Sequence, residues 1–394
     1  MRRRALVVIT AAAYLNSGNI DSLRCTLGTF PPFRLFAIIF VMDDKTIAGY
    51  KDKKVLITGH TGFKGSWLSE ILLMAGAEVH GFALEPETKP ALFSQLRLAR
   101  RIASHTIGDV RDAVVLLDAV RRVRPQFIFH LAAQPLVRRS YREPAETFAA
   151  NVMGTVNLLE ACRRLALPCS VVCITTDKCY ENDNSGRPFR ETDPMGGADP
   201  YSASKGACEI AIASYRRSFF SAPDSPVRVA SARAGNVIGG GDWAEDRIVP
   251  DAMRAFLKGK PLVVRNRRAT RPWQHVLEPL SGYLALALAL ERPECRSAFN
   301  FGPSPATIRT VEALAKRLAA HFPNAAVEHH ADPSAPAEAR LLQLDSTKAA
   351  KTLGWKPRWG FVRTVDETAA WYSAVARGES PRVVTDAQIE RFFA

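Results

Sequence analysis

The stretch from Lys53 to Gly76, KKVLITGHTGFKGSWLSEILLMAG, constrains the fold most strongly, because it predicts a strand, a glycine-rich turn and a helix in succession. Val55 to Thr58 form a short apolar run, and the turn that follows carries Gly59, Gly62 and Gly65. Without side chains, these positions let the backbone bend sharply, approach a pyrophosphate closely and pack the helix against the strand. We therefore expect a diphosphate on the free amides at the start of the helix, the alternative being a simple tight turn.

The composition is that of a globular protein with a basic surface. Hydrophobic residues make up 47% and charged residues 23% of the 394 positions, which excludes a disordered chain and allows two domains. Of the formal charge of +14, residues 1–41 carry +4, because they hold five arginines and one aspartate. The remaining +10 is spread without a long Lys/Arg run, which favours anionic small molecules as ligands and not nucleic acid.

The cysteines and histidines do not predict a metal site. The seven cysteines are odd in number, unevenly spaced and without the paired spacing of a zinc site, which favours reduced thiols in a cytoplasmic protein: Cys25, Cys162, Cys169, Cys173, Cys179, Cys208 and Cys295. The neighbouring His329 and His330 lack the spacing of metal ligands on a helix or in a zinc finger. We therefore expect no metal.

The first fifty residues allow three interpretations. MRRRALVVITAAAYLNSG has the basic start and apolar run of a signal peptide, whereas the apolar run at 35–41 is too short to span a bilayer. In the third interpretation the protein starts at Met42, and residues 1–41 are poorly ordered and carry no chemistry. We favour the third interpretation, since the remaining chain has the motifs of an intracellular nucleotide-dependent protein, and we assign residues 1–49 to an extension outside the domains.

The rest of the chain alternates regularly between strands and helices. Beyond the first strand, we expect strands at 77–83, 105–108, 126–129, 170–175 and 227–232, and helices at about 112–124, 146–167 and from Pro200. This alternation predicts an α/β fold with a Rossmann-like, doubly wound parallel sheet.

The pattern loosens after the sixth strand, where GNVIGGGDWAEDRIVPD has the glycines and acids of a ligand-closing loop. Further helices are expected near 309–321, 345–353 and 361–376, with Pro-rich linkers at 303–305 and 333–336. We therefore assign residues 50–236 and about 268–293 to a dinucleotide-binding domain. A smaller, mixed α/β substrate domain would comprise about 237–267 and 294–390.

Several strand ends carry candidate binding residues. The second strand runs through apolar residues to Glu85, so its end does not decide between NAD and NADP. Asp109, just past the third strand, could contact the adenine, and a cap for the helix at 112–124 is the compatible alternative. Small residues after the fourth strand leave room for a flat ring, and Asn151 is the polar exception on an otherwise apolar helical stripe.

Two groups of residues predict the chemistry of a dehydrogenase. The fifth strand delivers Thr176, Asp177 and Lys178 at its end, and the next helix carries Tyr201 and Lys205 one turn apart on the same face. An ammonium one turn away, together with a cationic nicotinamide, favours the phenolate and makes Tyr201 a plausible proton acceptor from a hydroxyl. Thr176 could hydrogen-bond the same oxygen while hydride passes to the cofactor.

A cluster of arginines follows in the segment 262–275, LVVRNRRATRPWQH, which packs four arginines into fourteen residues. Phosphate binding is the natural task for one of them in a nucleotide-dependent enzyme. A solvated basic loop is the alternative for Arg267 and Arg268.

Taken together, TGHTGFKG, HLAAQP, TTDKCYEN and YSASK, in this order and at these intervals, resemble the extended short-chain dehydrogenase/reductase family of nucleotide-sugar enzymes. More narrowly, HTGFKGSWL, TDKCYEN, ARAGNVIGGGDWAEDRIVPD and RPWQHVLEPLSGYL are similar to the CDP-glucose 4,6-dehydratase branch. The resemblance runs from about Asp52 to Leu353 and does not cover the first forty-odd residues.

What the resemblance implies is a redox-neutral lyase. Tyr201 would take the proton from the glucose 4-hydroxyl while hydride leaves C4 for NAD. The resulting ketone acidifies C5, the 6-hydroxyl departs as water, and hydride returns to C6, so NAD would stay bound through turnover. By position, Asp177 would be the acid at the 6-hydroxyl. Lys178 stands where many related dehydratases have a glutamate base, so the C5 base stays open between Lys178 and another group.

The resemblance also implies binding residues and partners. NAD would be held by the glycine turn and the strand ends, at Gly59, Thr61, Gly62, Phe63, Lys64, Gly65, Asp109, Val110, Leu131, Ala132, Ala133, Asn151, Thr175, Tyr201 and Lys205. The nucleotide sugar would be contacted by Gln134, and its diphosphate by Asn236, Arg247 and Arg271. We further expect a cytoplasmic homo-oligomer, dimer or tetramer, paired through helices at 141–167 and 200–220, without a membrane or nucleic-acid partner. Its place would be deoxysugar biosynthesis for lipopolysaccharide O-antigen.

Two other functions are considered. A nucleotide-sugar 4-epimerase, or a dehydratase of dTDP- or GDP-sugars, would share the fold, but an epimerase has no use for Asp177 and Lys178 beside Thr176. A non-catalytic dinucleotide sensor could lose Tyr201 or Lys205 freely, so the presence of both counts against it.

Overall fold

The computed structural model describes residues 45–182, 184–330 and 342–394, and these form one compact unit. Our expectations for residues 1–41, including Cys25, and for the linker at 333–336 lie outside the described residues. Among the described helices, none combines the length and the apolar character needed to cross a membrane.

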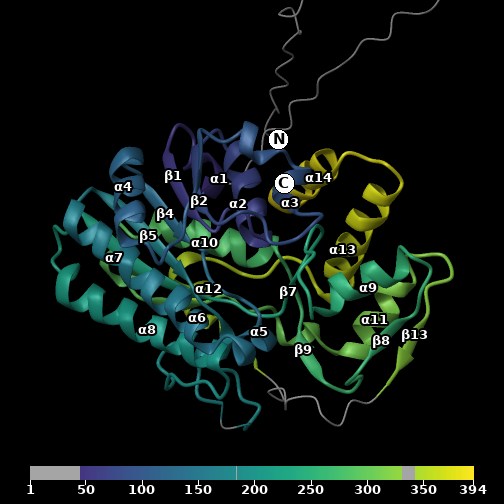
Figure 1. The fold of residues 1–394 in the computed structure, drawn as a ribbon. Helices are drawn as coiled ribbons and strands as arrows, with labels where there is room; N and C mark the ends of the chain where they lie inside the picture. Colours follow the sequence, from purple (N-terminus) through teal and green to yellow (C-terminus); the bar gives the residue numbers. More distant parts are fainter. Residues whose placement is uncertain (1–44, 183, 331–341) are drawn as a thin grey trace, which may run out of the picture. The chain divides into compact units, whose positions relative to one another are not determined.

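A seven-stranded parallel sheet in the order β11-β6-β5-β4-β1-β2-β3 forms the centre of the fold (Figure 1). Its strands are β1 Lys54–Thr58, β2 Glu78–Ala83, β3 Ser104–Ile107, β4 Phe127–His130, β5 Cys169–Ile174, β6 Val227–Arg233 and β11 Ala298–Asn300. From β1 the chain builds outward to β3 and then returns to place β4 on the other side of β1. The order in which the chain adds strands to the sheet reverses there, between β1 and β4, and ligands bind at such a point in open parallel sheets. The predicted α/β class and the six predicted strands are confirmed.

Helices connect the strands. They are α1 Lys45–Ala48, α2 Phe63–Met74, α3 Leu92–Gln95, α4 Ala113–Val123, α5 Val137–Arg142, α6 Pro144–Phe148, α7 Gly154–Leu165, α8 Pro200–Phe219, α9 Ile248–Phe256, α10 Leu277–Ala289, α11 Val311–Ala319, α12 Thr347–Leu353, α13 Phe361–Ala376 and α14 Pro381–Phe393. A π-helical turn, Ala149–Met153, joins α6 to α7, so the predicted helix at 146–167 is one segment with a widened turn at Asn151. Helix α10 was not among our predicted helices; its residues are apolar and buried nearly all round, and they show no amphipathic stripe.

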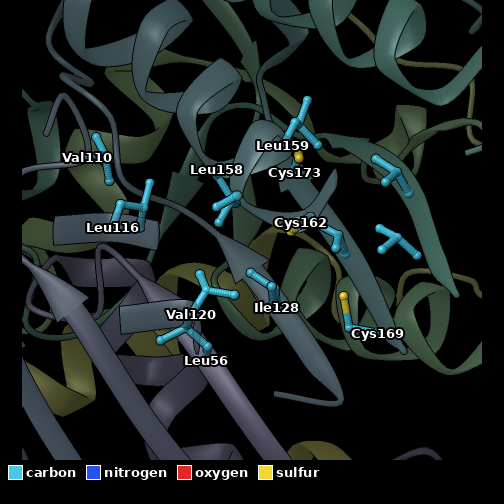
Figure 2. Packing of buried hydrophobic residues seen from close by; sticks show 14 of the residues in the cluster. Leu56, Val110, Leu116, Val120, Ile128, Leu158, Leu159, Cys162, Cys169 and Cys173 are labelled. Atoms are coloured by element: carbon cyan, nitrogen blue, oxygen red, sulfur yellow. The ribbon is translucent and has the colours of Figure 1, made fainter. Parts of the chain in front are cut away.

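One hydrophobic core lies between the sheet and helices α4, α7 and α8. Figure 2 shows Leu56 and Ile128 of the sheet together with Val120 of α4 and Leu158 of α7. The other face of β4 packs on Tyr50, whose ring centroid lies 5.0 Å from that of Phe127. Burial on both faces explains the apolar runs of the strands. The six described cysteines are buried and free, as expected for reduced thiols.

Three short two-stranded sheets are described beyond residue 236, where we expected a substrate domain at about 237–267 and 294–390 and a return to the dinucleotide-binding domain at about 268–293. They pair β7 Val237–Ile238 with β10 Gln274–His275, β8 Leu262–Val264 with β13 Val327–His329, and β9 Thr270–Pro272 with β12 Ile308–Thr310. However, β11 belongs to the central sheet and α14 packs against α2, although β11 and most of α14 lie in the range of about 294–390 that we assigned to the substrate domain. The chain therefore returns to the dinucleotide-binding half at β11 and again at α14, in addition to the return that we expected at about 268–293.

The cap of α4 is Asp112 and not Asp109. The Asp112 side chain accepts hydrogen bonds from the amides of Val114 and Val115, both at 3.0 Å. The Asp109 carboxylate instead bonds the Arg111 amide at 2.8 Å and its guanidinium. The alternative that Asp109 caps this helix is therefore wrong, because Asp112 stands one residue before the first helical residue, where a cap must lie.

We expect Asp112→Ala to lower the free energy of unfolding by about 1 kcal/mol, because two amides of the first turn lose their partner. Urea denaturation measures this loss. Asp118→Ala on the same helix is the control; it removes only an exposed pair with Arg122 and should cost less than about 0.5 kcal/mol. Equal losses in the two variants would contradict the cap.

Candidate functional site

The glycine turn lies directly against the end of β4. Gly59 has a φ of +77°, and a Cβ there would lie 2.6 Å from the backbone nitrogen of Ala132. A Cβ on Gly65 would lie 2.2 Å from the Gly59 oxygen, so these glycines give the sharp bend and the tight helix packing that we predicted. A Cβ on Gly62 would meet nothing closer than 3.4 Å. Gly62 is also the N-cap residue of α2, where no described side chain caps the amides. The turn therefore fits a diphosphate.

The other turn residues face two directions. Thr61 Oγ1 donates to the carbonyl oxygen of Leu84, just past β2, at 2.9 Å. The ring of Phe63 approaches Gly239, where an added Cβ would lie 3.2 Å from it. Burial, together with the positive charge of Arg247, lowers the pKa of Lys64 to about 8. Lys64 is thus a cation close to Arg247, not a solvated surface lysine.

The residues after β3 and β4 line the same edge of the sheet. The Arg111 guanidinium holds the pKa of Asp109 below its usual range, so Asp109 is a carboxylate at this edge. Val110 is buried, and its carbonyl oxygen accepts from Asn157 at 3.0 Å. Leu131 and Ala132 turn back onto β1 and donate their amides to the backbone and side-chain oxygens of Thr58. Ala133 follows, half-buried, and adds no side chain large enough to fill the space.

Asn151 and Gln134 hold each other. Asn151 Oδ1 accepts from the Gln134 amide at 2.8 Å, and Asn151 Nδ2 donates to Ser204 Oγ at 2.9 Å. The Gln134 side chain donates to Thr147 and accepts from the Leu136 amide. The π-helical turn turns Asn151 inward, so both predicted binding residues fix the loop after β4 against α8.

Thr176, Asp177 and Lys178 form a short loop directly after β5. Thr176 Oγ1 donates to Asp177 Oδ1 at 2.9 Å, and Asn236 Nδ2 donates to Asp177 Oδ2 at 3.1 Å. Lys178 Nζ lies 3.8 Å from Asp177 Oδ1. The Asp177 side chain is 2% exposed and that of Lys178 is 29% exposed. The structure thus brings Asn236, predicted as a diphosphate contact, to the carboxylate of a predicted catalytic residue.

Tyr201 and Lys205 face this loop from α8. Burial raises the pKa of Tyr201, and a hydrogen bond with Thr176 acts in the opposite direction. Lys205 Nζ donates to the Ile174 carbonyl oxygen at 3.3 Å, and burial lowers its pKa. Among the groups of the described chain that lower the pKa of Tyr201, Thr176 and Arg247 are prominent and Lys205 is not. Lys205 is therefore not among the largest influences on the pKa of Tyr201.

The two predicted arginines lie on different elements. Arg247, at the start of α9, pairs with Asp242 at 3.0 Å; although burial alone would lower its pKa, Asp242 raises it. Arg271 lies on β9 and donates to the Thr270 carbonyl oxygen at 2.8 Å. The positive charge of Arg247 lowers the pKa of both Tyr201 and Lys64, so Arg247 is the predicted arginine that lies near these two residues.

Sequence reasoning missed some residues of the site. Ser140 Oγ accepts from the Tyr201 amide at 3.1 Å, and Glu209 accepts from Thr175 Oγ1 at 2.5 Å. Glu209 had a signal in the sequence, since it stands four residues after Lys205 and continues the stripe of Tyr201 and Lys205. Within the ranges that the structure describes, no three His, Cys, Asp or Glu side chains gather as metal ligands.

The glycine turn after β1 lies where the strand order reverses, and the Tyr201–Lys205 pair on α8 faces Thr176 at the end of β5. Together these features define an extended short-chain dehydrogenase/reductase. The family model described as GDP-mannose 4,6 dehydratase matches residues 56–368, and the chain belongs to this family.

Individual relatives narrow the likeness. The chain is 44% identical over 350 residues to the CDP-glucose 4,6-dehydratase of Salmonella typhimurium (strain LT2), an alignment that covers 88% of this chain and 97% of the relative. It is 25% identical over 335 residues to a dTDP-glucose 4,6-dehydratase of Xanthomonas campestris, covering 80% of this chain and 92% of the relative.

Solved structures support the fold. A UDP-glucose 4-epimerase of Thermus thermophilus in complex with NAD is 28% identical, with a TM-score of 0.66 over 82% of this chain and 99% of that one. A dTDP-glucose 4,6-dehydratase of Bacillus anthracis in complex with NAD is 20% identical, with a TM-score of 0.68 over 83% of this chain and 99% of that one. At that identity the second comparison supports the fold alone.

Two alanine substitutions in the glycine turn separate close packing from free space. Gly65→Ala would place a Cβ 2.2 Å from a backbone oxygen, and we expect it to lower the free energy of unfolding by about 3 kcal/mol. Gly62→Ala, whose Cβ has room, should leave stability unchanged. Thermal or urea denaturation compares them, and a stable Gly65→Ala protein would contradict the packing of α2 on β1.

Proposed function

We propose that this protein is an NAD-dependent dehydratase that converts CDP-glucose to CDP-4-keto-6-deoxyglucose. One observation carries the proposal: Thr176, Asp177 and Lys178 stand together on the loop after β5, and α8 carries Tyr201 against Thr176. The choice of CDP-glucose is supported by the 44% identity to a CDP-glucose 4,6-dehydratase, against 25% to a dTDP-glucose enzyme.

The cofactor would lie along the edge formed by the glycine turn and the strand ends. The amides that begin α2 and the cation of Lys64 suit its diphosphate, and Asp109 suits the adenosine. When bound, NAD accepts hydride from C4 of the sugar and returns it to C6. Support for NAD comes from the Thermus thermophilus structure, which holds it in the same fold.

The first step is removal of the 4-hydroxyl proton by Tyr201. The Thr176 hydroxyl lies close enough to the phenol to lower the pKa of Tyr201 and would hold the phenol in position, and Lys205 Nζ bonds the end of β5 from the same helix. Since burial raises the pKa of Tyr201, the phenol needs positive charge on its ligand side before it can ionise to the phenolate, which is the form that accepts a proton. Proton removal and hydride loss at C4 are thereby coupled.

Elimination follows on the same loop. Lys178, in its neutral form, would take the proton from C5, and the electron pair of that C–H bond would form the C5–C6 double bond. The C6–O bond breaks as Asp177 gives a proton to the leaving oxygen, so water departs. Lys178 then returns its proton to C5 as C6 receives hydride. Asn236 and Thr176 each donate to Asp177 and hold it in one orientation for this transfer.

The nucleotide diphosphate would be bound by cations of the substrate region. Arg247 and Lys64 lie together at the site, and Arg271 would approach it from β9. Because these arginines lie beyond the sixth strand, we propose that this region forms the substrate domain. Strand β11 and helix α14 are reassigned from it to the dinucleotide-binding half. Gln134 and Asn151 would shape the sugar pocket through the loop after β4.

Among rival functions, a 4-epimerase would use Tyr201 and Thr176 but not Asp177. The burial of Asp177 and its two side-chain donors favour a dehydratase, since a carboxylate held in this way carries a desolvation cost that an epimerase would not need.

Exposed apolar side chains support a homodimer through α5 to α8. They are Tyr141, Phe148, Met153, Ile210 and Phe219, each between 39% and 62% exposed. Sedimentation that gives only monomer at micromolar concentration would reject this surface. The buried free thiols and the nucleotide-sugar substrate favour the cytoplasm, and the product suits deoxysugar biosynthesis for O-antigen.

Transfer of a label tests the reaction. We expect CDP-glucose deuterated at C4 to yield product with deuterium at C6, because the same two electrons are removed and returned. Mass spectrometry and NMR of the product measure the transfer. Turnover of dTDP-glucose in place of CDP-glucose would reject the nucleotide assignment, and a C4 epimer without loss of water would reject the dehydratase.

Two substitutions separate oxidation from elimination. Asp177→Asn should still form reduced nicotinamide on mixing with CDP-glucose but release product at least about a hundredfold more slowly, because the proton donor to the leaving oxygen is gone. Tyr201→Phe should bind NAD and form no reduced nicotinamide. Stopped-flow absorbance distinguishes the two. Near-normal turnover in either variant removes that residue from its role.

A further inference from the structure

A buried ion pair holds the catalytic loop from behind. Glu209 on α8 and Arg233 at the end of β6 are each 4% exposed, and Arg233 Nη2 lies 2.7 Å from Glu209 Oε2. Neither residue has a part in the reaction described above. Their hydrogen-bond partners, however, include Thr175, directly before the catalytic loop, and Tyr180, two residues after Lys178.

The Glu209 end of the pair fixes the start of the loop. Glu209 Oε1 accepts from Thr175 Oγ1 at 2.5 Å, and Oε2 accepts from Ser231 Oγ at 2.7 Å. Thr175 directly precedes Thr176, so the carboxylate determines where the side chain that bonds Tyr201 begins.

The Arg233 end fixes the other end of the loop. Arg233 Nη1 donates to the Tyr180 hydroxyl at 2.6 Å, and that hydroxyl donates to Asn300 Oδ1 at 2.7 Å. The Tyr180 ring stacks on Phe189 with centroids 4.9 Å apart. The residue after Cys179 is thus anchored to β6 and to β11, and the loop is attached at both ends to one ion pair.

Three successive turns of α8 contact this loop. Tyr201 faces Thr176, whose hydroxyl lowers the pKa of the phenol. Lys205 bonds the Ile174 carbonyl oxygen, and Glu209 bonds Thr175. These residues stand four apart and therefore share one face of the helix. A change at Glu209 would alter how the whole face sits on the end of β5.

The pair remains charged. Burial alone would raise the pKa of Glu209, but the charge and hydrogen bond of Arg233, with those of Thr175 and Ser231, hold it below its usual range. Buried pairs of this kind can often be replaced by apolar residues of similar volume without loss of stability. Stability is therefore not a sufficient reason for this pair, whereas its hydrogen-bond geometry is specific to the loop.

We propose that Glu209 and Arg233 are positioning residues that set the catalytic loop against Tyr201. This inference rests on the proposed function and deepens it. The pair touches neither sugar nor cofactor; it fixes Thr175 and Tyr180, and through them the line from Thr176 to Tyr201 and the orientation of Asp177.

The first test replaces the pair with apolar residues, in the double variant Glu209→Met/Arg233→Met. We expect a folded protein in which backbone amides of residues 175–180 exchange hydrogen about ten- to a hundredfold faster, because both anchors are lost. The matched control removes a more exposed pair far along the chain, Arg317 with Asp366, as Arg317→Met/Asp366→Leu. The control should leave exchange at 175–180 unchanged.

The second measurement isolates oxidation. CDP-6-deoxyglucose has a 4-hydroxyl but no leaving group at C6, so reaction stops at reduced nicotinamide. We expect the double variant to form reduced nicotinamide about ten- to a hundredfold more slowly than the wild type, with the dissociation constant for NAD unchanged. A purely structural role would lower the melting temperature and leave this rate, measured well below that temperature, as in the wild type.

Tyr180→Phe keeps the proposal testable if the double variant does not fold. It removes one hydroxyl, which bridges Arg233 and Asn300, and keeps the ring on Phe189. The oxidation rate should fall about tenfold. A wild-type rate in this variant overturns the proposal, as do wild-type exchange or a wild-type oxidation rate in the folded double variant.

Failure of the proposed function is recognised separately. If the wild-type protein oxidises no CDP-sugar, the substrate assignment is rejected. Hydrogen exchange needs no substrate, so the comparison of the double variant with its control then decides by itself whether the pair holds the loop.

Discussion

The site depends on the close approach of the Gly59 backbone to Leu131 and Ala132. A side chain at Gly59 would collide with the chain after β4, and one at Gly65 would collide with Gly59 itself. This contact brings the carboxyl ends of β1 and β4 together at the point where the strand order of the sheet reverses. The dinucleotide turn, the small residues after β4 and the loop after β5 consequently share one edge. Any larger residue at this contact would separate the cofactor from the catalytic loop.

Burial and charge compete throughout this edge. Burial raises the pKa of Tyr201 and lowers those of Lys64 and Lys205, so each of these groups is biased toward its neutral form. Opposite charges restore ionisation only where they are close, as at Glu209 with Arg233 and Asp109 with Arg111. The paired groups therefore stay charged and hold geometry, whereas Tyr201 and Lys205 are shifted toward their neutral forms.

Much of the fold was predictable from the sequence because the strands are apolar runs at regular intervals. The glycine turn and the stripe of Tyr201 and Lys205 were predictable for a similar reason, since a local pattern fixes their geometry. The alternative of an Asp109 cap on α4 was wrong, because both Asp109 and Asp112 follow β3. Only the backbone angles decide which of the two aspartates caps the helix. Strand β11 is three residues long, too short for a period to show.

The parts of the site that sequence reasoning missed are those made between distant segments. Arg233 meets Glu209 across two elements, and Tyr180 reaches Asn300 across 120 positions of the chain. No local pattern carries such a distance. Likewise, the bond that Asn236 donates to Asp177 joins segments 59 positions apart, and Asn236 stays a predicted diphosphate contact.

The position of β11 at the edge of the central sheet has a consequence for synthesis on the ribosome. β6 has its partner β5 early, but its other edge, which carries Arg233, receives β11 only after the intervening substrate region has been made. Until then that edge offers unpaired backbone groups to other chains, a known route to aggregation. Because Asn300 completes the bonds around Tyr180, the loop that carries the chemistry reaches its final shape among the last parts of the nascent protein.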